Sequence, residues 1–148
     1  MKVGVLIELF KDTDIDARFA ELRSMGMESC QLVCWDREIL HDDSVAEAVN
    51  AAVEKHQVHI TAFWCGWEGR RVWDFYEGQL TLGLVPADYR VERLKMLMEG
   101  SDFAKKIHAT DFATHVGYMP ENPYDPNYQG VLTACKAIVE KCRENGQN

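Results

Sequence analysis

Apolar residues follow two alternating patterns along this chain, short near-continuous runs and longer stretches with helical spacing. A near-continuous run is typical of a strand covered on both faces, as in a parallel sheet. Four such runs predict strands at residues 3–9, 30–35, 58–64 and 111–115. After each run, apolar residues recur every three or four positions, which predicts a helix after every strand.

Local signals mark the ends of the first two predicted helices. The first helix extends over residues 15–25, and Gly26 stops it because glycine tolerates the left-handed conformation of a helix end. The second helix begins at Ser44 and Glu47, whose S-x-x-E spacing fits a capping box. One apolar stripe follows on this second helix: Val45, Ala48, Val49, Ala52 and Val53.

The third and fourth helices are expected over residues 88–107 and 131–142. Gly100 lies inside the third helix, where glycine costs about 1 kcal/mol relative to alanine and can mark a break. Gly146 ends the fourth helix.

The alternation of strand and helix predicts an α/β fold with one parallel sheet. Right-handed crossovers allow an open doubly wound sheet or a barrel, and periodicity by itself does not choose between them. Neither G-x-G-x-x-G nor G-x-x-x-x-G-K follows the first strand, so the usual dinucleotide-binding and P-loop folds are not supported. A flavodoxin-like sheet would need a phosphate-binding first loop, which residues 10–13 match only weakly.

The length favours part of a barrel, because a closed eight-unit barrel usually takes about 250 residues. We therefore predict that residues 1–148 form one domain with four βα units of a TIM (β/α)8 barrel. This is a half barrel with parallel strands, the N-terminal half, and it stops at Gln147 and Asn148 before a fifth strand.

Charge and composition exclude several classes of partner. The formal net charge is −8, and the basic residues are outnumbered and scattered, which argues against a nucleic-acid backbone as partner. No apolar run approaches the about 18 residues of a membrane span, and the start lacks the order of a signal peptide. We expect a cytoplasmic protein that binds neither nucleic acid nor membrane.

The five cysteines include no C-x-x-C pair, so neither a zinc knuckle nor a thioredoxin-type redox motif is supported. Buried cysteines usually act as small apolar groups. Cys65 is the candidate for a reactive thiol, because it lies where a strand opens into a loop.

Ligands bind beyond the carboxyl ends of the strands in either α/β architecture, so residues at these ends are site candidates. Glu8 ends the first predicted strand, where a carboxylate can serve as acid, base or ligand. The alternative for Glu8 is an ion pair with an arginine at the barrel mouth. His115 ends the fourth predicted strand, where a neutral imidazole can ligate a divalent metal or hydrogen-bond a substrate oxygen; the alternative is a structural role.

The connection over residues 65–87 is long and rich in aromatic residues, which is typical of a functional loop. Trp64 and Trp67 stand at its start. Aromatic rings suit a sugar, whose C–H faces stack on them; the alternative is that these rings only extend the core. Three arginines in or after this connection are candidates for holding a phosphate group: Arg70, Arg71 and Arg90. The alternative is that they are solvated surface charges.

Four segments carry a resemblance to a known family: residues 26–35, Trp64-Cys65-Gly66-Trp67, residues 81–86 before Tyr89 and Arg90, and residues 114–126. In these segments the chain resembles the sugar phosphate isomerase/epimerase family of xylose isomerase-like TIM barrels. The resemblance covers essentially the whole chain, as the N-terminal half of that family.

The resemblance implies an enzyme of carbohydrate metabolism that carries out aldose–ketose isomerisation or epimerisation of a sugar or sugar phosphate. It also implies a divalent metal ion, Mn, Mg, Co or Zn, in the full-length parent. The family's main metal-binding and acid–base residues lie on strands five to eight, so no catalytic residue is assigned within this half. The positions in this half that could bind substrate are Glu8, Trp64, Trp67 and His115, and His115 is also the metal candidate. We expect this chain alone to bind no metal tightly and to be inactive.

Two other functions fit the pattern. A half barrel leaves two sheet edges unpaired, and such edges recruit partners, so the chain could be a non-catalytic, self-associating interaction module. On the same ground we expect a homo-oligomer. A metal-dependent nuclease of the same barrel superfamily is disfavoured by the acidic charge balance.

Overall fold

One parallel sheet organises the structure, a computed structural model that describes residues 3–148. Its strands lie in the order β1 (Val5–Leu9), β2 (Ser29–Cys34), β3 (His59–Cys65) and β4 (Phe112–Ala113). The longer helices are α1 (Ile15–Ser24), α3 (Asp43–His56), α5 (Ala87–Lys106) and α6 (Tyr128–Glu144). Two short helices, α2 (Arg37–Leu40) and α4 (Gly78–Thr81), were not predicted, since four residues are too few to show a helical period.

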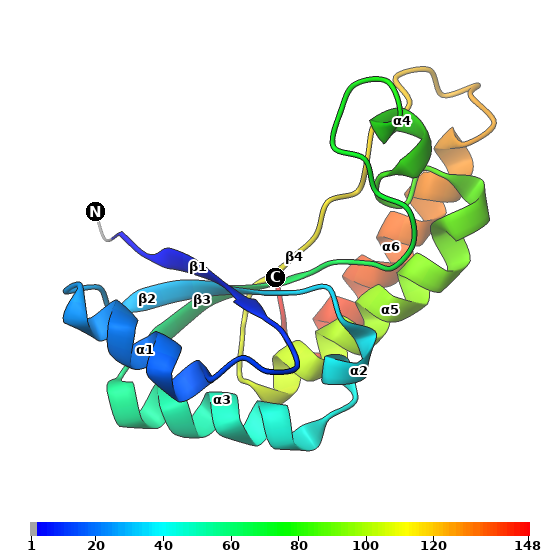
Figure 1. The fold of residues 1–148 in the computed structure, drawn as a ribbon. Coiled ribbons are helices and arrows are strands. Elements are labelled where there is room, and N and C mark those ends of the chain that lie inside the picture. The colour runs from blue at the N-terminus through cyan, green and yellow to red at the C-terminus, as the bar shows by residue number, and fades with distance from the viewer. Residues whose placement is uncertain (1–2) are drawn as a thin grey trace.

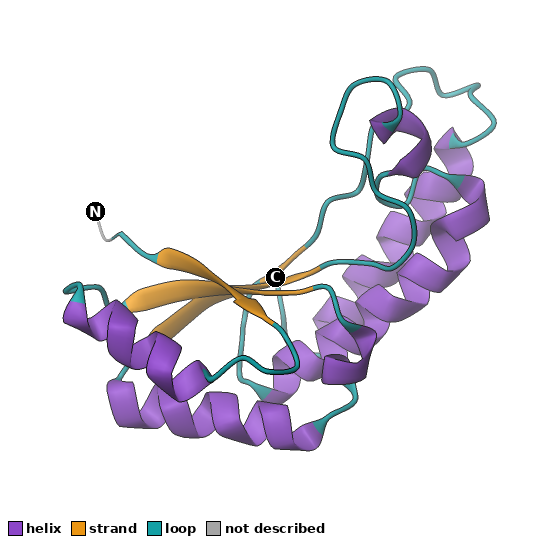
Figure 2. Cartoon of the chain, viewed as in Figure 1, coloured by secondary structure: helices purple, strands orange, loops and turns teal. Residues whose placement is uncertain are grey.

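The longer helices lie along the same face of the sheet, and no element within residues 3–148 covers the opposite face (Figure 1 and Figure 2). Helix α1 packs against α3, and α5 packs against both α2 and α6. A doubly wound sheet would reverse its strand order and carry helices on both faces. The observed order excludes that alternative and confirms the predicted half barrel of four parallel βα units.

The two faces of the sheet differ in their side chains because successive residues of a strand point to opposite faces. On the face toward the helices, Ile7, Leu32 and Phe63 are buried, and each contributes about 2 kcal/mol to folding by leaving water. On the opposite face, Glu8 lies beside Val33 and Val33 beside Trp64 in the strand register. This second face remains open to solvent toward the β1 edge, where 52% of Leu6 is exposed.

The fourth strand is shorter than predicted. Residues 111–115 were expected to form it, yet only Phe112 and Ala113 pair with β3. Beyond them the hydroxyl of Thr114 donates to the carbonyl of Cys65 at 2.9 Å, so a side-chain hydrogen bond takes over from the backbone ladder. On its outer side, the carbonyls and amides around residue 111 bond with Asn148, whose N–H donates to Thr110 O at 2.8 Å.

The start of helix α3 also differs from the prediction, because Ser44 and Glu47 do not form the capping box. Asp42 is the N-cap, and its Oδ1 accepts from the Ser44 hydroxyl at 2.6 Å and from the Ser44 N–H at 2.9 Å. These bonds, chiefly that from the hydroxyl, lower the pKa of Asp42. A carboxylate at the positive end of the helix dipole is favoured as the cap.

Gly100 does not break helix α5, which continues from Ala87 to Lys106. A Cβ at this position would overlap the Sγ atom of Cys65 on β3. The absence of a side chain at Gly100 therefore lets the helix approach the sheet closely. Glycine occupies this position because of packing, and the helix continues through it. No helix within residues 3–148 has both the length and the hydropathy needed to cross a membrane.

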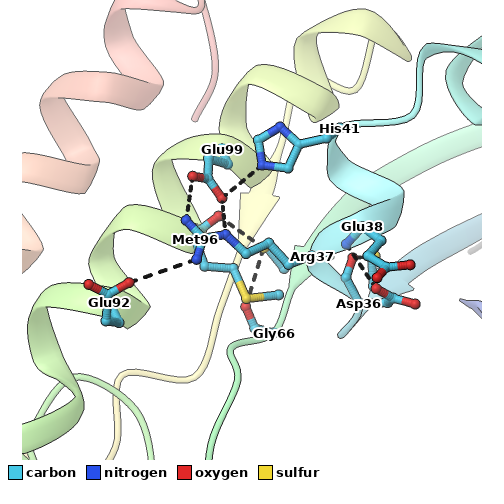
Figure 3. Close-up of polar contacts among 10 residues, drawn as sticks. Asp36, Arg37, Glu38, His41, Gly66, Glu92, Met96 and Glu99 are labelled. Atoms are coloured by element: carbon cyan, nitrogen blue, oxygen red, sulfur yellow. Dashed lines mark hydrogen bonds and ion pairs between the residues drawn. The ribbon is translucent and has the colours of Figure 1, made fainter.

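A part-buried ion pair fastens the short helix α2 to α5 (Figure 3). Arg37 donates from Nε and Nη2 to the two carboxylate oxygens of Glu99, both at 2.6 Å. Glu92 lies 3.8 Å from the same guanidinium, and the ring of His41 lies 3.3 Å from Glu99. The hydrogen bonds from Arg37 lower the pKa of Glu99. This bidentate pair holds the chain that follows β2.

The pair should make stability depend on acid pH. Because the folded-state pKa of Glu99 lies below its unfolded value of 4.5, the stabilisation is present above that value and is lost as the pH falls through the folded pKa. We expect Glu99→Gln to lower the free energy of unfolding by about 1–2 kcal/mol at neutral pH and by progressively less as the pH falls below 4.5. Urea unfolding across this pH range measures the difference. The control Glu140→Gln, at an exposed position on α6, should show little change at any pH; an undiminished Glu99→Gln effect in acid would contradict the assignment.

Candidate functional site

A hollow of about 360 Å³ opens on the uncovered face of the sheet, near the carboxyl ends of β1, β2 and β3. We refer to it as the mouth hollow. It lies where α/β barrels carry their sites. Its lining combines one carboxylate, one guanidinium, three indole rings and two aliphatic side chains: Glu8, Arg71, Trp35, Trp64, Trp73, Leu6 and Val33.

Trp35 stands at the centre of the aromatic wall. Its ring makes edge-to-face contacts with Trp64 at 5.8 Å, Trp67 at 5.4 Å and Trp73 at 6.3 Å between centroids. A Cβ on Gly66 would overlap the Trp35 ring, so this glycine makes room for it. Edge-to-face packing of this kind holds rings rigidly. Trp73 remains 53% exposed and offers an open ring at the rim.

Trp64 contributes a donor that lacks a partner. Its Nε1 atom is buried, and no hydrogen bond to it forms among residues 3–148. An unpaired buried donor costs about 1–3 kcal/mol. The role of Trp64 in substrate binding remains a prediction; the residue lines the hollow, while its Nε1 atom is shielded from solvent.

Glu8 lines the same hollow and is only partly buried. Its carboxylate forms no ion pair with any lysine, arginine or histidine in the described part of the chain, so the alternative of a structural ion pair finds no support there. Its backbone carbonyl, by contrast, accepts a long 3.5 Å hydrogen bond from the Thr13 hydroxyl. The carboxylate is therefore available to accept hydroxyl groups.

His115 is not among the residues that line the mouth hollow, but it contacts one of them. Its ring contacts Trp73 edge-to-face at 4.9 Å, and its Nδ1 accepts the Gly117 N–H at 3.0 Å. The neutral ring therefore carries its proton on Nε2 and acts there as a donor. A donor suits a substrate oxygen, whereas metal ligation through Nε2 would require this tautomer to change. Both roles of His115 remain predictions.

Trp67 is fully buried, although the sequence offered it as a substrate contact. Its Nε1 donates to the carbonyl of His115 at 3.1 Å, and its ring stacks beside that of Trp73 at 6.1 Å. Arg93 covers the ring with its guanidinium at 4.4 Å. Since no surface of Trp67 is left for a ligand, its position indicates a supporting role under the wall.

The connection over residues 66–86 is held in place by Arg93 of helix α5, which is only 2% exposed. The guanidinium donates to four carbonyl oxygens, those of Glu68, Arg70, Thr81 and Gly83, at 2.7–3.1 Å. Burial lowers the pKa of Arg93 to about 10, so it stays charged at neutral pH. The loop that carries Trp73 is thus fixed by a single buried cation.

The three arginines proposed for phosphate binding are placed differently. Arg90 is engaged with the carbonyls of Leu84 and Val85 at 2.7 and 2.6 Å, and Arg70 pairs with Glu77. Arg71 lies over the Trp35 ring at 4.6 Å and lines the mouth hollow. Arg71 is therefore the arginine positioned to meet an anionic group in the hollow.

Cys65 has the properties of an inert thiol. It is fully buried, and burial raises its pKa well above the ordinary value. Its Sγ donates to the carbonyl of Gly66 at 3.3 Å. A nucleophilic cysteine needs a lowered pKa and access to solvent, so the structure does not support the reactive role considered for Cys65.

Solved structures share this architecture. A xylose isomerase domain protein from Planctomyces limnophilus matches 98% of this chain, and 50% of its own, with a TM-score of 0.84 and 21% identity. The 3-keto-D-glucoside 4-epimerase from E. coli matches 99% of this chain and 54% of its own (TM-score 0.63, 17% identity). A D-psicose 3-epimerase studied in the presence of D-fructose matches 100% of this chain and 50% of its own (TM-score 0.64, 11% identity). This chain has the fold of a xylose isomerase-like half barrel.

The half barrel spans about half the length of the structures that it matches. Neither a family model nor a curated protein matches its sequence. At these identities the likeness concerns the fold, and the predicted resemblance to xylose isomerase-like barrels is confirmed at that level.

The resemblance implies a divalent metal, which would need several donor side chains close together. Within residues 3–148, no three histidine, cysteine, aspartate or glutamate side chains gather closely enough to hold a metal ion. The sequence offered Glu8 and His115 as possible ligands, and His115 presents a proton rather than a lone pair at Nε2. The donors of residues 3–148 therefore do not form a metal centre by themselves.

Two important residues of the half barrel were not singled out by the sequence prediction. Trp35 lies in the range 31–36, which the sequence offered as a strand end at the site, but no role was assigned to it. Arg93 left a weaker signal, its helical spacing with the buried Met96 and Leu97. Sequence alone could not show that loop carbonyls would surround it.

Proposed function

We propose that this half barrel provides a sugar-binding wall of a sugar isomerase or epimerase, and that the sugar lies in the mouth hollow. The observation that carries the proposal is that one hollow is lined both by an exposed ring, Trp73, and by the carboxylate of Glu8, which forms no ion pair among residues 3–148. Sugars need both apolar faces and polar partners. Two of the matching structures are sugar epimerases by their names, which supports this class.

Each lining group has a role in this proposal. The Trp73 ring stacks on the C–H face of the sugar, the Trp64 ring forms part of the apolar wall, and Glu8 accepts from one or two hydroxyls. Arg71 adds a cation that would bind the phosphate of a sugar phosphate. The hollow thus accepts a neutral sugar and favours a phosphorylated one.

Glu8 is also the group in the hollow that could move a proton next to a carbonyl. Moving a proton between two faces or two carbons of a sugar needs an acid and a base that are correctly placed. The hollow lining holds one carboxylate, so we expect the chain by itself to bind sugar without turning it over. A full-length parent, with a metal and further carboxylates as the resemblance implies, would carry out the isomerisation or epimerisation.

Isothermal titration with D-fructose, D-psicose and a ketohexose phosphate tests the binding. We expect measurable binding by the purified chain, with Trp73→Ala and Glu8→Gln each weakening it by about tenfold, or roughly 1.4 kcal/mol. Tyr124→Ala is the matched control, because Tyr124 is 93% exposed and lies outside the hollow. Arg71→Met should remove only the preference for the phosphorylated sugar.

Several outcomes would contradict the proposal. Binding that no variant of the hollow weakens, or that Tyr124→Ala weakens equally, would place the sugar elsewhere. If none of the sugars bound, the proposed sugar-binding function would be wrong. Turnover of a ketose by the purified chain at the rate of a full-length enzyme would refute the expected inactivity.

A further inference from the structure

The segment after β4 is bonded to the loop that follows β3, and the two run side by side beyond the sheet in Figure 1. The hydroxyl of Thr114 donates to the Cys65 carbonyl at 2.9 Å. Two residues further along, the carbonyl of Val116 accepts the Leu84 N–H at 2.7 Å. His115 lies between these two bonds, so its backbone is held at a fixed position against the loop.

The ring of His115 is fixed as well as its backbone. Its Nδ1 accepts the Gly117 N–H at 3.0 Å, and this bond sets the rotation of the imidazole. The His115 carbonyl accepts from Trp67 Nε1 at 3.1 Å. Gly117 has φ +99°, and a Cβ there would overlap the carbonyl oxygen of Leu82. The turn that presents the N–H to the imidazole is therefore itself built against the loop.

Trp73 has three ring neighbours, and His115 is the nearest of them. Trp67 stacks beside the Trp73 ring with 6.1 Å between centroids and 19° between planes. Trp35 meets the same ring edge-to-face at 6.3 Å, whereas the ring of His115 meets it edge-to-face at 4.9 Å. Trp73 is nevertheless 53% exposed. Its indole is thus supported by three rings and still presents an open surface to a ligand.

We propose that His115 is a positioning residue for sugar binding, which acts through Trp73 and does not touch the sugar. This rests on the proposed function, since it takes Trp73 as the stacking ring. A side chain that is already immobile loses little freedom when a ligand binds, and ordering one flexible side chain weakens association by roughly three- to tenfold. His115 supplies this preorganisation, because its ring is held by a backbone N–H and lies outside the lining of the hollow.

A double-mutant cycle on sugar affinity tests the positioning role. We expect His115→Ala to weaken the binding of D-fructose by about three- to tenfold in the native background, and by less than about twofold in the Trp73→Ala background. The effect disappears in the second background because the ring that His115 supports is already absent. Equal effects in both backgrounds would show that His115 contacts the sugar directly, and would overturn the proposal.

Two further variants separate the ring of His115 from its nitrogen atoms. His115→Phe keeps a ring beside Trp73 but has no nitrogen, and it should retain the affinity within about twofold. His115→Asn keeps an acceptor for the Gly117 N–H but no ring, and it should bind as weakly as His115→Ala. A loss in His115→Phe as large as that in His115→Ala would mean that a nitrogen binds the sugar or a metal, against the proposal.

The near-UV circular dichroism of the tryptophan rings gives a readout that needs no sugar. His115→Ala should reduce the signal that Trp73→Ala removes, and the double variant should resemble Trp73→Ala alone. His59→Ala is the matched control, since His59 is exposed at the start of β3, at the opposite end of that strand from the hollow. It should change neither the spectrum nor the affinity. Urea unfolding of each variant shows that the fold persists.

The positioning role and the sugar site can fail separately. If no sugar binds to the native chain, the proposed function is wrong, and the near-UV spectra still decide whether His115 holds Trp73. If sugar binds but neither the affinity nor the spectrum responds to His115→Ala, the positioning role is wrong and the sugar site stands. An equal effect of His59→Ala would overturn the positioning role in the same way.

Discussion

Replacing Gly83 by alanine is expected to lower the free energy of unfolding by about 3–4 kcal/mol. Alanine is disfavoured in the left-handed backbone conformation of this residue, and its Cβ would also clash with a neighbouring segment. Gly83 has φ +64°, and a Cβ there would overlap the backbone carbonyl group of Val116. The two segments are bonded at this point, where the Leu84 N–H donates to Val116 O at 2.7 Å. Because backbone rather than a flexible side chain stands in the way, the segments must separate. Urea unfolding followed by far-UV circular dichroism measures the loss.

Gly26→Ala separates the two contributions. Gly26 also has a left-handed φ, +77°, but a Cβ there meets no atom within 4 Å. Its substitution should therefore cost only the conformational part, about 1 kcal/mol. Equal losses in both variants would show that the close approach between Gly83 and Val116 does not exist. A larger loss at Gly83 locates the junction that holds the loop of residues 66–86 against the segment after β4.

Replacing Arg93 by methionine should have an effect of similar size, about 3–5 kcal/mol, because it removes the donors of several buried carbonyl groups. The side chain also lies between the rings of Trp67 and Tyr89, each 4.4 Å from the guanidinium. Methionine restores part of the packing volume but none of the hydrogen bonds. Arg93→Lys should recover little, since an ammonium group cannot reach in four directions as the planar guanidinium does. Urea unfolding gives the stability change.

The near-UV circular dichroism of the tryptophan wall gives a second, local measurement. Loss of Arg93 should release the loop and weaken the signal of the packed rings even where the fold persists. Lys95→Met removes a cation from an exposed position on the same helix and should change stability by less than about 0.5 kcal/mol. A loss of stability with an unchanged near-UV signal would mean that Arg93 supports the core and not the loop.

These two residues connect the fold to the proposed sugar site. Gly83 and Arg93 both act on the loop that carries Arg71 and Trp73, one through backbone approach and the other through carbonyl hydrogen bonds. Helices α2 and α5, which are joined by the ion pair of Arg37 and Glu99, hold the chain that follows β2 and Trp35. The wall of the mouth hollow is thus fixed from two sides, which a stacking surface for sugar requires.

The sequence by itself determined the four βα units, their parallel direction and the end of the sheet at which the site lies. Near-continuous apolar runs and helical spacing are local signals, readable within ten or so residues. Glu8 could be selected in the same way, because the end of a strand can be located from the strand alone. The half-barrel prediction followed from these signals together with the length and the family resemblance.

The tertiary structure decided which of the candidate side chains face solvent. Trp67 and Trp73 belong to the same loop and the same residue type, yet one is fully buried and the other is 53% exposed. The difference arises because Arg93 and His115, far along the chain, close over Trp67. Exposure in a loop depends on contacts between distant residues, and no local spacing encodes such contacts; this is the physical reason why the elements were predictable and the wall of the site was not.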